Sequence, residues 1–309
     1  MARIYENTYF NDKITPIQEA SLSIASSAVL YGLSVYTVFP ITVAADGTLM
    51  AFRLGDHFKR LLDSARIIGI DTFEPEWTLE RFTGAVRDLV AANDVQETVF
   101  VRATVHVDEL VPGTRSRGLH TALSMFIYEA TPIVPQDGAR LKTSVWRRIP
   151  DYAIPSRAKV NGAYVNSVLA KQDAIDSGYD DCIFLDAAGH VCELSAANIF
   201  IVRNNTLITP DTTSDLLEGI NRRTVLELAA ALGIAVAERS IDLTELYIAD
   251  EVFACGTSAY VAPITEIDAR VVGDGAIGPL TQKIRTAYQG LLKGEGQGKP
   301  GHLTVVGTR

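Results

Sequence analysis

The segment 131–139, TPIVPQDGA, most constrains how this chain of 309 residues can fold. It contains two prolines and a glycine among polar residues, without hydrophobic periodicity, which is typical of a linker between domains. The whole chain is also longer than one ordinary hydrophobic core accommodates. The sequence therefore predicts a small α/β domain over 1–130, the linker, and a large domain over 140–309.

Strand-like runs and amphipathic helices are mixed on both sides of the linker. The β-branched and aromatic run 29–43 predicts a strand, and Asp56 is placed to cap a helix over 57–69. Asn204-Asn205 predicts a tight hairpin, and the glycine-rich stretch 294–302 predicts a loosely ordered tail. Strands and helices do not alternate regularly, so the fold class is α+β with mixed sheets rather than a doubly wound fold.

Composition excludes several classes of protein. The net charge of −9 and the isoelectric point near 5.1 argue against a nucleic-acid partner, which clustered Lys and Arg would bind. The start of the chain does not resemble a signal peptide, and no run of 18 apolar residues predicts a membrane span. Three cysteines without a CxxC motif favour a reducing, cytoplasmic location. The five histidines lack ligand spacing, so no metal site is expected.

Four short motifs contain residues suited to catalysis or anion binding. Lys159 lies at a strand-to-helix junction, where a desolvated amine becomes nucleophilic. Glu193 ends a strand, Gly219 precedes a helix whose first N–H groups favour an anion, and Thr257 follows a glycine after a strand. Taken singly, each motif also fits an ordinary surface lysine, hairpin glutamate, helix start or glycine turn.

Their order along the chain resembles that of the fold-type IV aminotransferases, which use pyridoxal 5′-phosphate (PLP). The branched-chain amino acid aminotransferases are the most similar members. The resemblance implies the two-domain fold of that group, which D-amino acid aminotransferases share. The motifs that carry it are AKVNGAYVNSVLAKQDA, GYDDCIFLD, GHVCELSAANIF, LLEGINRRTVLELA and DEVFACGTSAYVAPI.

The resemblance implies a role for each matching residue. Lys159 matches the lysine that bonds PLP and moves the substrate Cα proton, and Glu193 matches the carboxylate on the pyridine nitrogen. Tyr164 matches the tyrosine beside the 3-oxygen of the ring, and Asn198 has a supporting role. The implied phosphate ligands are Arg60, the backbone N–H groups of Ile220 and Asn221, and the Thr257 hydroxyl.

The substrate motifs depart from the branched-chain pattern. That family continues YGLSVY with Glu-Gly-Ile-Arg, whereas this chain continues with residues 37–40, Thr-Val-Phe-Pro. Phe100 replaces a tyrosine, and Arg102 matches the arginine for the distal carboxylate of an acidic co-substrate. His106 points to the same side as Arg102, although D-amino acid aminotransferases space such a pair two apart. The implied substrate residues are Tyr31, Tyr36, Val38, Phe100, Arg102, Thr257 and Ser258, and Arg115 and Arg117 are further carboxylate candidates.

Several functions follow from these motifs. A branched-chain amino acid aminotransferase comes first, on overall similarity. An (R)-selective amine:pyruvate transaminase follows, on Tyr36, Val38 and Phe100, and a D-amino acid transaminase comes third. Aminodeoxychorismate lyase and a non-catalytic PLP-binding protein complete the alternatives. The expected partners are an amino acid or amine donor, a 2-keto acid acceptor, and a second copy of the chain in a homodimer or larger homo-oligomer, whose site Tyr31 reaches.

Overall fold

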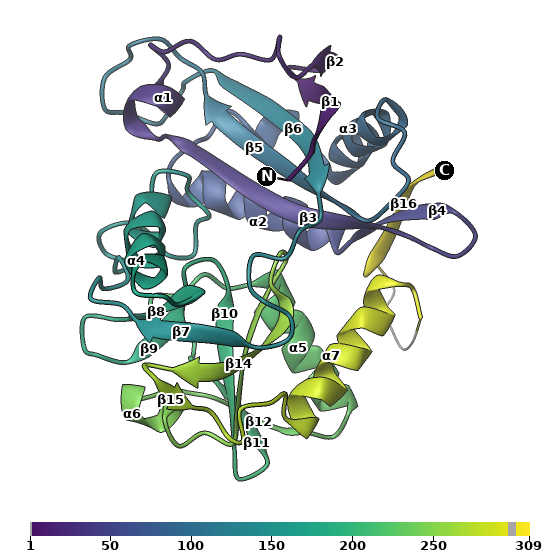
Figure 1. Cartoon of the computed structure of the whole chain (residues 1–309). Helices are drawn as coiled ribbons and strands as arrows, with labels where there is room; N and C mark the ends of the chain where they lie inside the picture. Colours follow the sequence, from purple (N-terminus) through teal and green to yellow (C-terminus); the bar gives the residue numbers. More distant parts are fainter. Residues whose placement is uncertain (1, 296–300) are drawn as a thin grey trace. The chain divides into compact units, whose positions relative to one another are not determined.

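The computed structural model describes residues 2–295 and 301–309, and it divides into two compact units (Figure 1). The first unit comprises residues 1–131, 158–162 and 292–309, and the second comprises 132–157 and 163–291. The segment around Lys159 and the C-terminal segment therefore group with the first unit by their contacts. The domain bounds proposed from the sequence stay a prediction.

An antiparallel sheet with the strand order β16-β4-β3-β5-β6-β1-β2 forms the centre of the first unit. Its strands are β1 (Ile4–Phe10), β2 (Lys13–Pro16), β3 (Ser34–Val43), β4 (Thr48–Phe52), β5 (Val99–Val107), β6 (Thr121–Glu129) and β16 (Leu303–Thr308). Its helices are α1 (Ser27–Tyr31), α2 (Leu54–Ile67), the short η1 (Glu74–Glu76) and α3 (Leu79–Ala91). Helices α2 and α3 pack against the sheet through apolar stripes, with the rings of Phe58 and Phe82 4.9 Å apart (Figure 1).

Two local predictions for this unit are wrong. Residues 29–31 belong to helix α1, which ends at Gly32 in the left-handed conformation (φ 64°), so the strand begins only at Ser34. Helix α2 begins at Leu54 instead of after an Asp56 cap. Asp56 lies in the first turn, where its charge favours the helix N-terminus and pairs with Arg53 Nε at 2.6 Å.

The second unit has a mixed sheet with the strand order β12-β11-β10-β13-β14-β7-β8-β9. Its strands are β7 (Ala139–Thr143), β8 (Asp181–Leu185), β9 (Val191–Leu194), β10 (Asn198–Arg203), β11 (Thr206–Thr209), β12 (Ala235–Glu238), β13 (Glu251–Gly256), β14 (Tyr260–Ile267) and β15 (Arg270–Val271). Its helices are α4 (Tyr164–Asp176), α5 (Ile220–Ala231), α6 (Leu243–Leu246) and α7 (Pro279–Leu292). Strand β9 also pairs with β10, which closes the strands from β10 to β9 into a ring.

Apolar side chains fill the core of this closed sheet, among them Ile183, Ile199 and Val252, each at most 2% exposed. Asn204 and Asn205 form the predicted hairpin turn between β10 and β11, both with positive φ (50° and 58°). Both sheets together confirm the α+β class. Of the tail expected to be loosely ordered, residues 296–300 lie outside the described residues.

Within residues 2–295 and 301–309, no helix combines the length and the apolar character that a membrane span requires. Across the same residues, no group of three or more His, Cys, Asp or Glu side chains is arranged to hold a metal ion.

Candidate active site

Lys159 lies on a short segment that adds to the sheet of the first unit beside β3. The N–H of Tyr36 donates to the Lys159 carbonyl at 3.0 Å, and the N–H of Asn161 donates to the Ser34 carbonyl at 2.9 Å. Between these two hydrogen bonds, Val35 and Val160 form an antiparallel bridge. The N–H of Lys159 itself donates to Ser64 Oγ of α2 at 3.0 Å. Hydrogen bonds on both sides therefore fix the backbone that carries the lysine.

The pairing puts Lys159, Asn161 and Tyr36 on the same face of the sheet, because side chains alternate along a strand. Lys159 Nζ lies 4.8 Å from the centroid of the Tyr36 ring. Arg102 Cζ of β5 lies over the same ring at 3.6 Å. Two cationic side chains thus meet one aromatic ring, the geometry of a cation–π contact.

The substrate residues predicted in β3 and β5 occupy this same face. In the antiparallel register, Val38 of β3 is paired with Arg102 of β5. Tyr36 lies two residues before Val38 on β3, and Phe100 lies two residues before Arg102 on β5, so all four share one face. Directly paired residues point the same way. Tyr36, Val38 and Phe100 are buried, whereas Arg102 is half-buried. The guanidinium of Arg102 therefore has buried side chains of Tyr36, Val38 and Phe100 beside it on this face.

His106 lies four residues after Arg102 on this face, and its Nε2 is 2.8 Å from Ser124 Oγ of β6. Burial, assisted by the positive charge of Arg102, lowers the pKa of His106 to about 4. His106 is therefore neutral at physiological pH, and Arg102 supplies the positive charge of the strand. Arg115 and Arg117 lie in the loop between β5 and β6, and their binding of a substrate carboxylate stays a prediction.

Arg60 is a residue of helix α2, and it contacts β3 through Thr37, whose side chain points to the face opposite Tyr36 and Val38. Its Nη2 donates to Thr37 Oγ1 at 3.1 Å, and the same hydroxyl shares a hydrogen bond with His57 Nδ1 at 2.8 Å. Thr37 and His57 are fully buried. The structure thus fixes Arg60 by hydrogen bonds, but on the face of the sheet away from Arg102.

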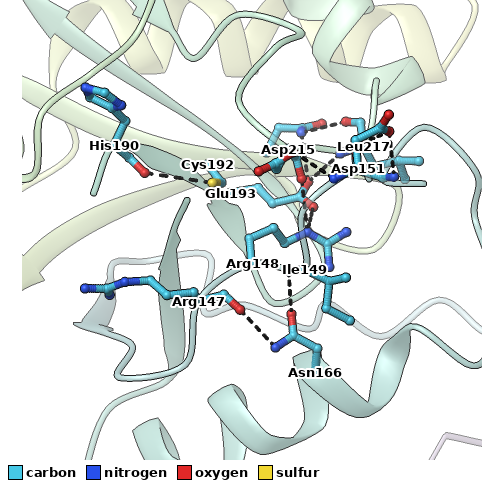
Figure 2. A network of polar contacts seen from close by, with 12 residues as sticks. Arg147, Arg148, Ile149, Asp151, Asn166, His190, Cys192, Glu193, Asp215 and Leu217 are labelled. Carbon is cyan, nitrogen blue, oxygen red and sulfur yellow. Dashed lines mark hydrogen bonds and ion pairs between the residues drawn. The ribbon is translucent and has the colours of Figure 1, made fainter. Parts of the chain in front are cut away.

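Glu193 is a buried carboxylate of the second unit, at the end of β9 (Figure 2). Its Oε1 is 3.0 Å from Arg148 Nε, and the same Nε donates to the Asp215 carbonyl at 3.3 Å. Its Oε2 accepts the Leu217 N–H and Asn198 Nδ2, both at 3.2 Å. A guanidinium and two neutral donors therefore favour the charged carboxylate at this buried position.

Asn198 connects Glu193 to the start of helix α5. Glu193 and Asn198 are the paired residues where β9 and β10 close the ring of strands. Asn198 Nδ2 also donates to the Leu217 carbonyl at 3.0 Å. A Cβ at Gly219, the N-cap of α5, would lie 2.0 Å from Asn198 Oδ1, so only glycine fits there.

The first turn of helix α5 contains two basic residues, Arg222 and Arg223. No side chain caps it, and its first turn contains no acidic residue. Asn221 Nδ2 donates to Thr257 Oγ1 at 3.2 Å, and the Tyr288 hydroxyl donates to Asn221 Oδ1 at 3.0 Å. A helix start with buried donors and a hydroxyl nearby is suited to an anion such as a phosphate. Ser258 follows Thr257, and its carbonyl accepts the N–H of residue 133 at 2.9 Å.

The structure groups the predicted residues within each unit. Lys159, Tyr36, Val38, Phe100 and Arg102 share one face of the first unit. A second group in the other unit consists of Glu193, Asn198, Ile220, Asn221, Thr257 and Ser258. Tyr164 is the first residue of α4, and Tyr31 ends α1 with 47% of its surface exposed.

Sequence reasoning missed three residues that hold these groups in place, namely Arg148, Asn161 and Ser64. Arg148 is the second of two adjacent arginines in the strand-like run 141–149, and a buried Glu193 requires a cationic partner, so charge pairing is the available signal. Asn161 stands in the motif next to Lys159, where only its backbone was considered. Nothing local in the sequence links Ser64 to Lys159, 95 residues away.

The chain is similar to proteins of one family along nearly its whole length. The family model described as "Amino-transferase class IV" matches residues 34–267. A probable branched-chain-amino-acid aminotransferase of Aquifex aeolicus is 36% identical over 301 residues, which is 96% of each chain. The branched-chain aminotransferase of Thermoproteus uzoniensis, solved with norvaline, superimposes with a TM-score of 0.92 at 34% identity, covering 98% of this chain and 99% of that one.

The branched-chain amino acid aminotransferase of Thermobaculum terrenum, solved in its PLP form, superimposes with a TM-score of 0.91 at 33% identity, covering 99% of both chains. These matches confirm the fold-type IV architecture and the PLP cofactor expected from the motifs. The chain therefore belongs to the class IV aminotransferases, enzymes that depend on pyridoxal 5′-phosphate.

Proposed function

We propose that this enzyme transfers the amino group of a branched-chain L-amino acid to 2-oxoglutarate. The observation that carries the proposal is the face on which the buried side chains of Tyr36, Val38 and Phe100 lie beside the guanidinium of Arg102. An aliphatic side chain is favoured by the apolar part, because its burial removes apolar surface from water. The distal carboxylate of 2-oxoglutarate is favoured by Arg102, whose N–H fork binds carboxylates bidentately.

The residues of the second unit fit the cofactor. Glu193 presents a buried carboxylate, already surrounded by donors, as a partner for the pyridine nitrogen. The start of α5, kept open by Gly219, and the Thr257 hydroxyl supply donors for the phosphate, and Arg60 is proposed as a further phosphate ligand. When bound, PLP supplies the electron sink for the charge that develops at the substrate Cα.

Lys159 is proposed as the catalytic base and acid. Its amine would hold the cofactor and, once freed by the substrate, would accept the proton from the substrate Cα and donate it again to complete the transfer. The fixed backbone at residues 159–161 limits where Nζ can reach, which favours transfer on one side of the substrate. Tyr164 is proposed to lie beside the 3-oxygen of the ring.

A screen of separate donors tests this function. The purified PLP form is mixed with L-leucine, D-alanine or (R)-1-phenylethylamine, and loss of its visible absorption band is followed by stopped flow. We expect rapid loss with L-leucine and little with the other two donors, followed by recovery of the band on addition of 2-oxoglutarate. Rapid loss with D-alanine or with the amine alone would assign the enzyme to that donor class instead. Pyruvate release from aminodeoxychorismate without an acceptor would identify a lyase.

We also propose that the enzyme is a homodimer that associates through an apolar patch of the first unit. The patch consists of Ile24, Val29, Leu30, Tyr31, Leu110 and Val111, which are between 47% and 84% exposed. Two backbone hydrogen bonds join its two segments, Ser27 N–H to the Glu109 carbonyl and Val111 N–H to the Ala25 carbonyl, both at 3.0 Å. Contiguous exposed apolar side chains indicate a protein interface, and a second copy is the partner that the enzyme always has available. Tyr31, inside the patch, is then placed to reach the partner's substrate.

The dimer is tested with a matched pair of variants. Val29→Asp puts a charge into the patch, and Val305→Asp puts the same charge on β16, where the valine is 52% exposed compared with 53% for Val29. Light scattering at micromolar concentration is expected to give twice the chain mass of 33.5 kDa for the unchanged enzyme and Val305→Asp, and a single chain mass for Val29→Asp. An unchanged mass for Val29→Asp would remove the patch from the interface.

The cytoplasm is the proposed location. Cys182, Cys192 and Cys255 are free thiols and buried, and burial raises the pKa of each thiol, for Cys255 to about 12. Free, unreactive thiols are consistent with a reducing compartment.

A further inference from the structure

Asn161 connects the lysine segment to the arginine of the substrate face. Its Oδ1 accepts a hydrogen bond from Arg102 Nη2, and its Nδ2 donates to Ser34 Oγ at 2.8 Å. The backbone of Asn161 is bonded to the same serine, whose carbonyl accepts its N–H. The amide can point in only one direction, because a reversed amide would place NH₂ against a guanidinium that contains donors alone.

The guanidinium of Arg102 is thereby restrained at two places. Its Cζ lies 3.6 Å from the centroid of the Tyr36 ring, and its Nη2 donates to Asn161 Oδ1. An arginine side chain has five N–H donors, so a contact through one edge is compatible with a carboxylate taking two donors from another. A side chain that is already ordered loses less rotational freedom when the carboxylate binds.

We infer that Asn161 is a positioning residue that orients Arg102 toward the distal carboxylate of an acidic 2-keto acid, and so contributes to the choice of acceptor. The inference rests on the proposed function, because it assumes that Arg102 receives this carboxylate. Asn161 acts on the acceptor and leaves the proton transfer to Lys159, whose backbone bonds do not involve the asparagine side chain.

Asn161→Ala tests this role, because it removes the side chain and retains the backbone bond to Ser34. We expect the KM for 2-oxoglutarate to rise about 10-fold, while kcat and the KM for the keto acid of leucine change less than about twofold. Binding of glutarate, which has both carboxylates and no keto group, gives a measurement independent of turnover. Calorimetry on the PLP form is expected to show about 10-fold weaker glutarate binding in Asn161→Ala.

Three further variants make the test specific. Arg102→Ala removes the guanidinium itself and so gives the largest rise in the KM for 2-oxoglutarate that lost positioning could cause. Ser34→Ala, which releases the amide but leaves Asn161 in place, is expected to raise the KM for 2-oxoglutarate by a smaller factor. Asn161→Asp retains the contact but pairs Arg102 with a negative charge that competes with the substrate carboxylate. The KM of this variant for 2-oxoglutarate is therefore expected to exceed that of Asn161→Ala and to depend on salt.

Two results would overturn the inference. Unchanged glutarate binding in Asn161→Ala would remove the asparagine from acceptor recognition. An equal loss with both keto acids, together with a lower kcat, would assign Asn161 a structural role under Lys159 instead. A failure of the proposed function is distinguishable, since the unchanged enzyme would then transfer no amino group to 2-oxoglutarate from L-leucine.

Discussion

Lys159→Ala is expected to remove the visible absorption band that PLP gives with the enzyme and to reduce turnover about 10³-fold or more. The side chain supplies both the bond to the cofactor and the base for the Cα proton, so no other residue replaces both functions. The backbone bonds of residue 159 with Tyr36 and Ser64 involve only its N–H and carbonyl groups, and alanine retains them. The variant is therefore expected to fold normally.

The control is Lys59→Ala in α2 of the same unit, where the side chain is 72% exposed and pairs with Asp63 four residues on. Its absorption spectrum and steady-state rate with L-leucine and 2-oxoglutarate should match those of the unchanged enzyme, because exposed pairs of this kind contribute little. A visible band and full activity in Lys159→Ala, at an unchanged melting temperature, would disprove the assignment of the lysine.

Glu193→Gln is expected to reduce turnover about 10²-fold or more, because a neutral amide no longer stabilises a protonated pyridine nitrogen. The same change leaves Arg148 facing a neutral group in a buried place, where its side chain is only 13% exposed. Removing one partner of a buried pair costs about 3–5 kcal/mol in the free energy of unfolding. Turnover and urea denaturation measure the two effects separately.

A double variant separates chemistry from stability. Adding Arg148→Met to Glu193→Gln removes the unpaired cation, so the free energy of unfolding should recover while the rate stays low. Glu218→Gln is the matched control, since this glutamate pairs with Arg157 at a position that is half exposed. If the rate recovered together with the stability, the carboxylate would have a structural role only.

The sequence was sufficient to predict the parts of the fold and the site that depend on local pattern. The hairpin at Asn204–Asn205 follows from two residues that tolerate positive φ, and the start of α5 follows from Gly219. The motifs of Lys159 and Glu193 together match one family and so indicate these two residues. The α+β class followed from irregular alternation of strands and helices.

Other features depend on residues that meet only after folding. The bonds from Lys159 to Ser64 and from Asn161 to Ser34 span 95 and 127 positions, and no periodicity reports them. Residues 29–31 include a β-branched and an aromatic side chain, yet they form the end of helix α1, which Gly32 terminates. Intrinsic strand propensity is a weak guide over three residues. The pairing of Arg148 with Glu193 can be predicted only when the burial of Glu193 is known.

The segment around Lys159 also has a consequence for solubility. Strand β3 pairs with β4 only from Ile41 onward, so residues 34–40 would present an unpaired strand edge on that side. Exposed edges of this kind recruit strands from other chains and start aggregation. Residues 159–161 cover the beginning of that edge. The peptide that positions the lysine therefore also protects the nascent sheet, and variants that loosen it should form aggregates during expression even where Lys159 itself is intact.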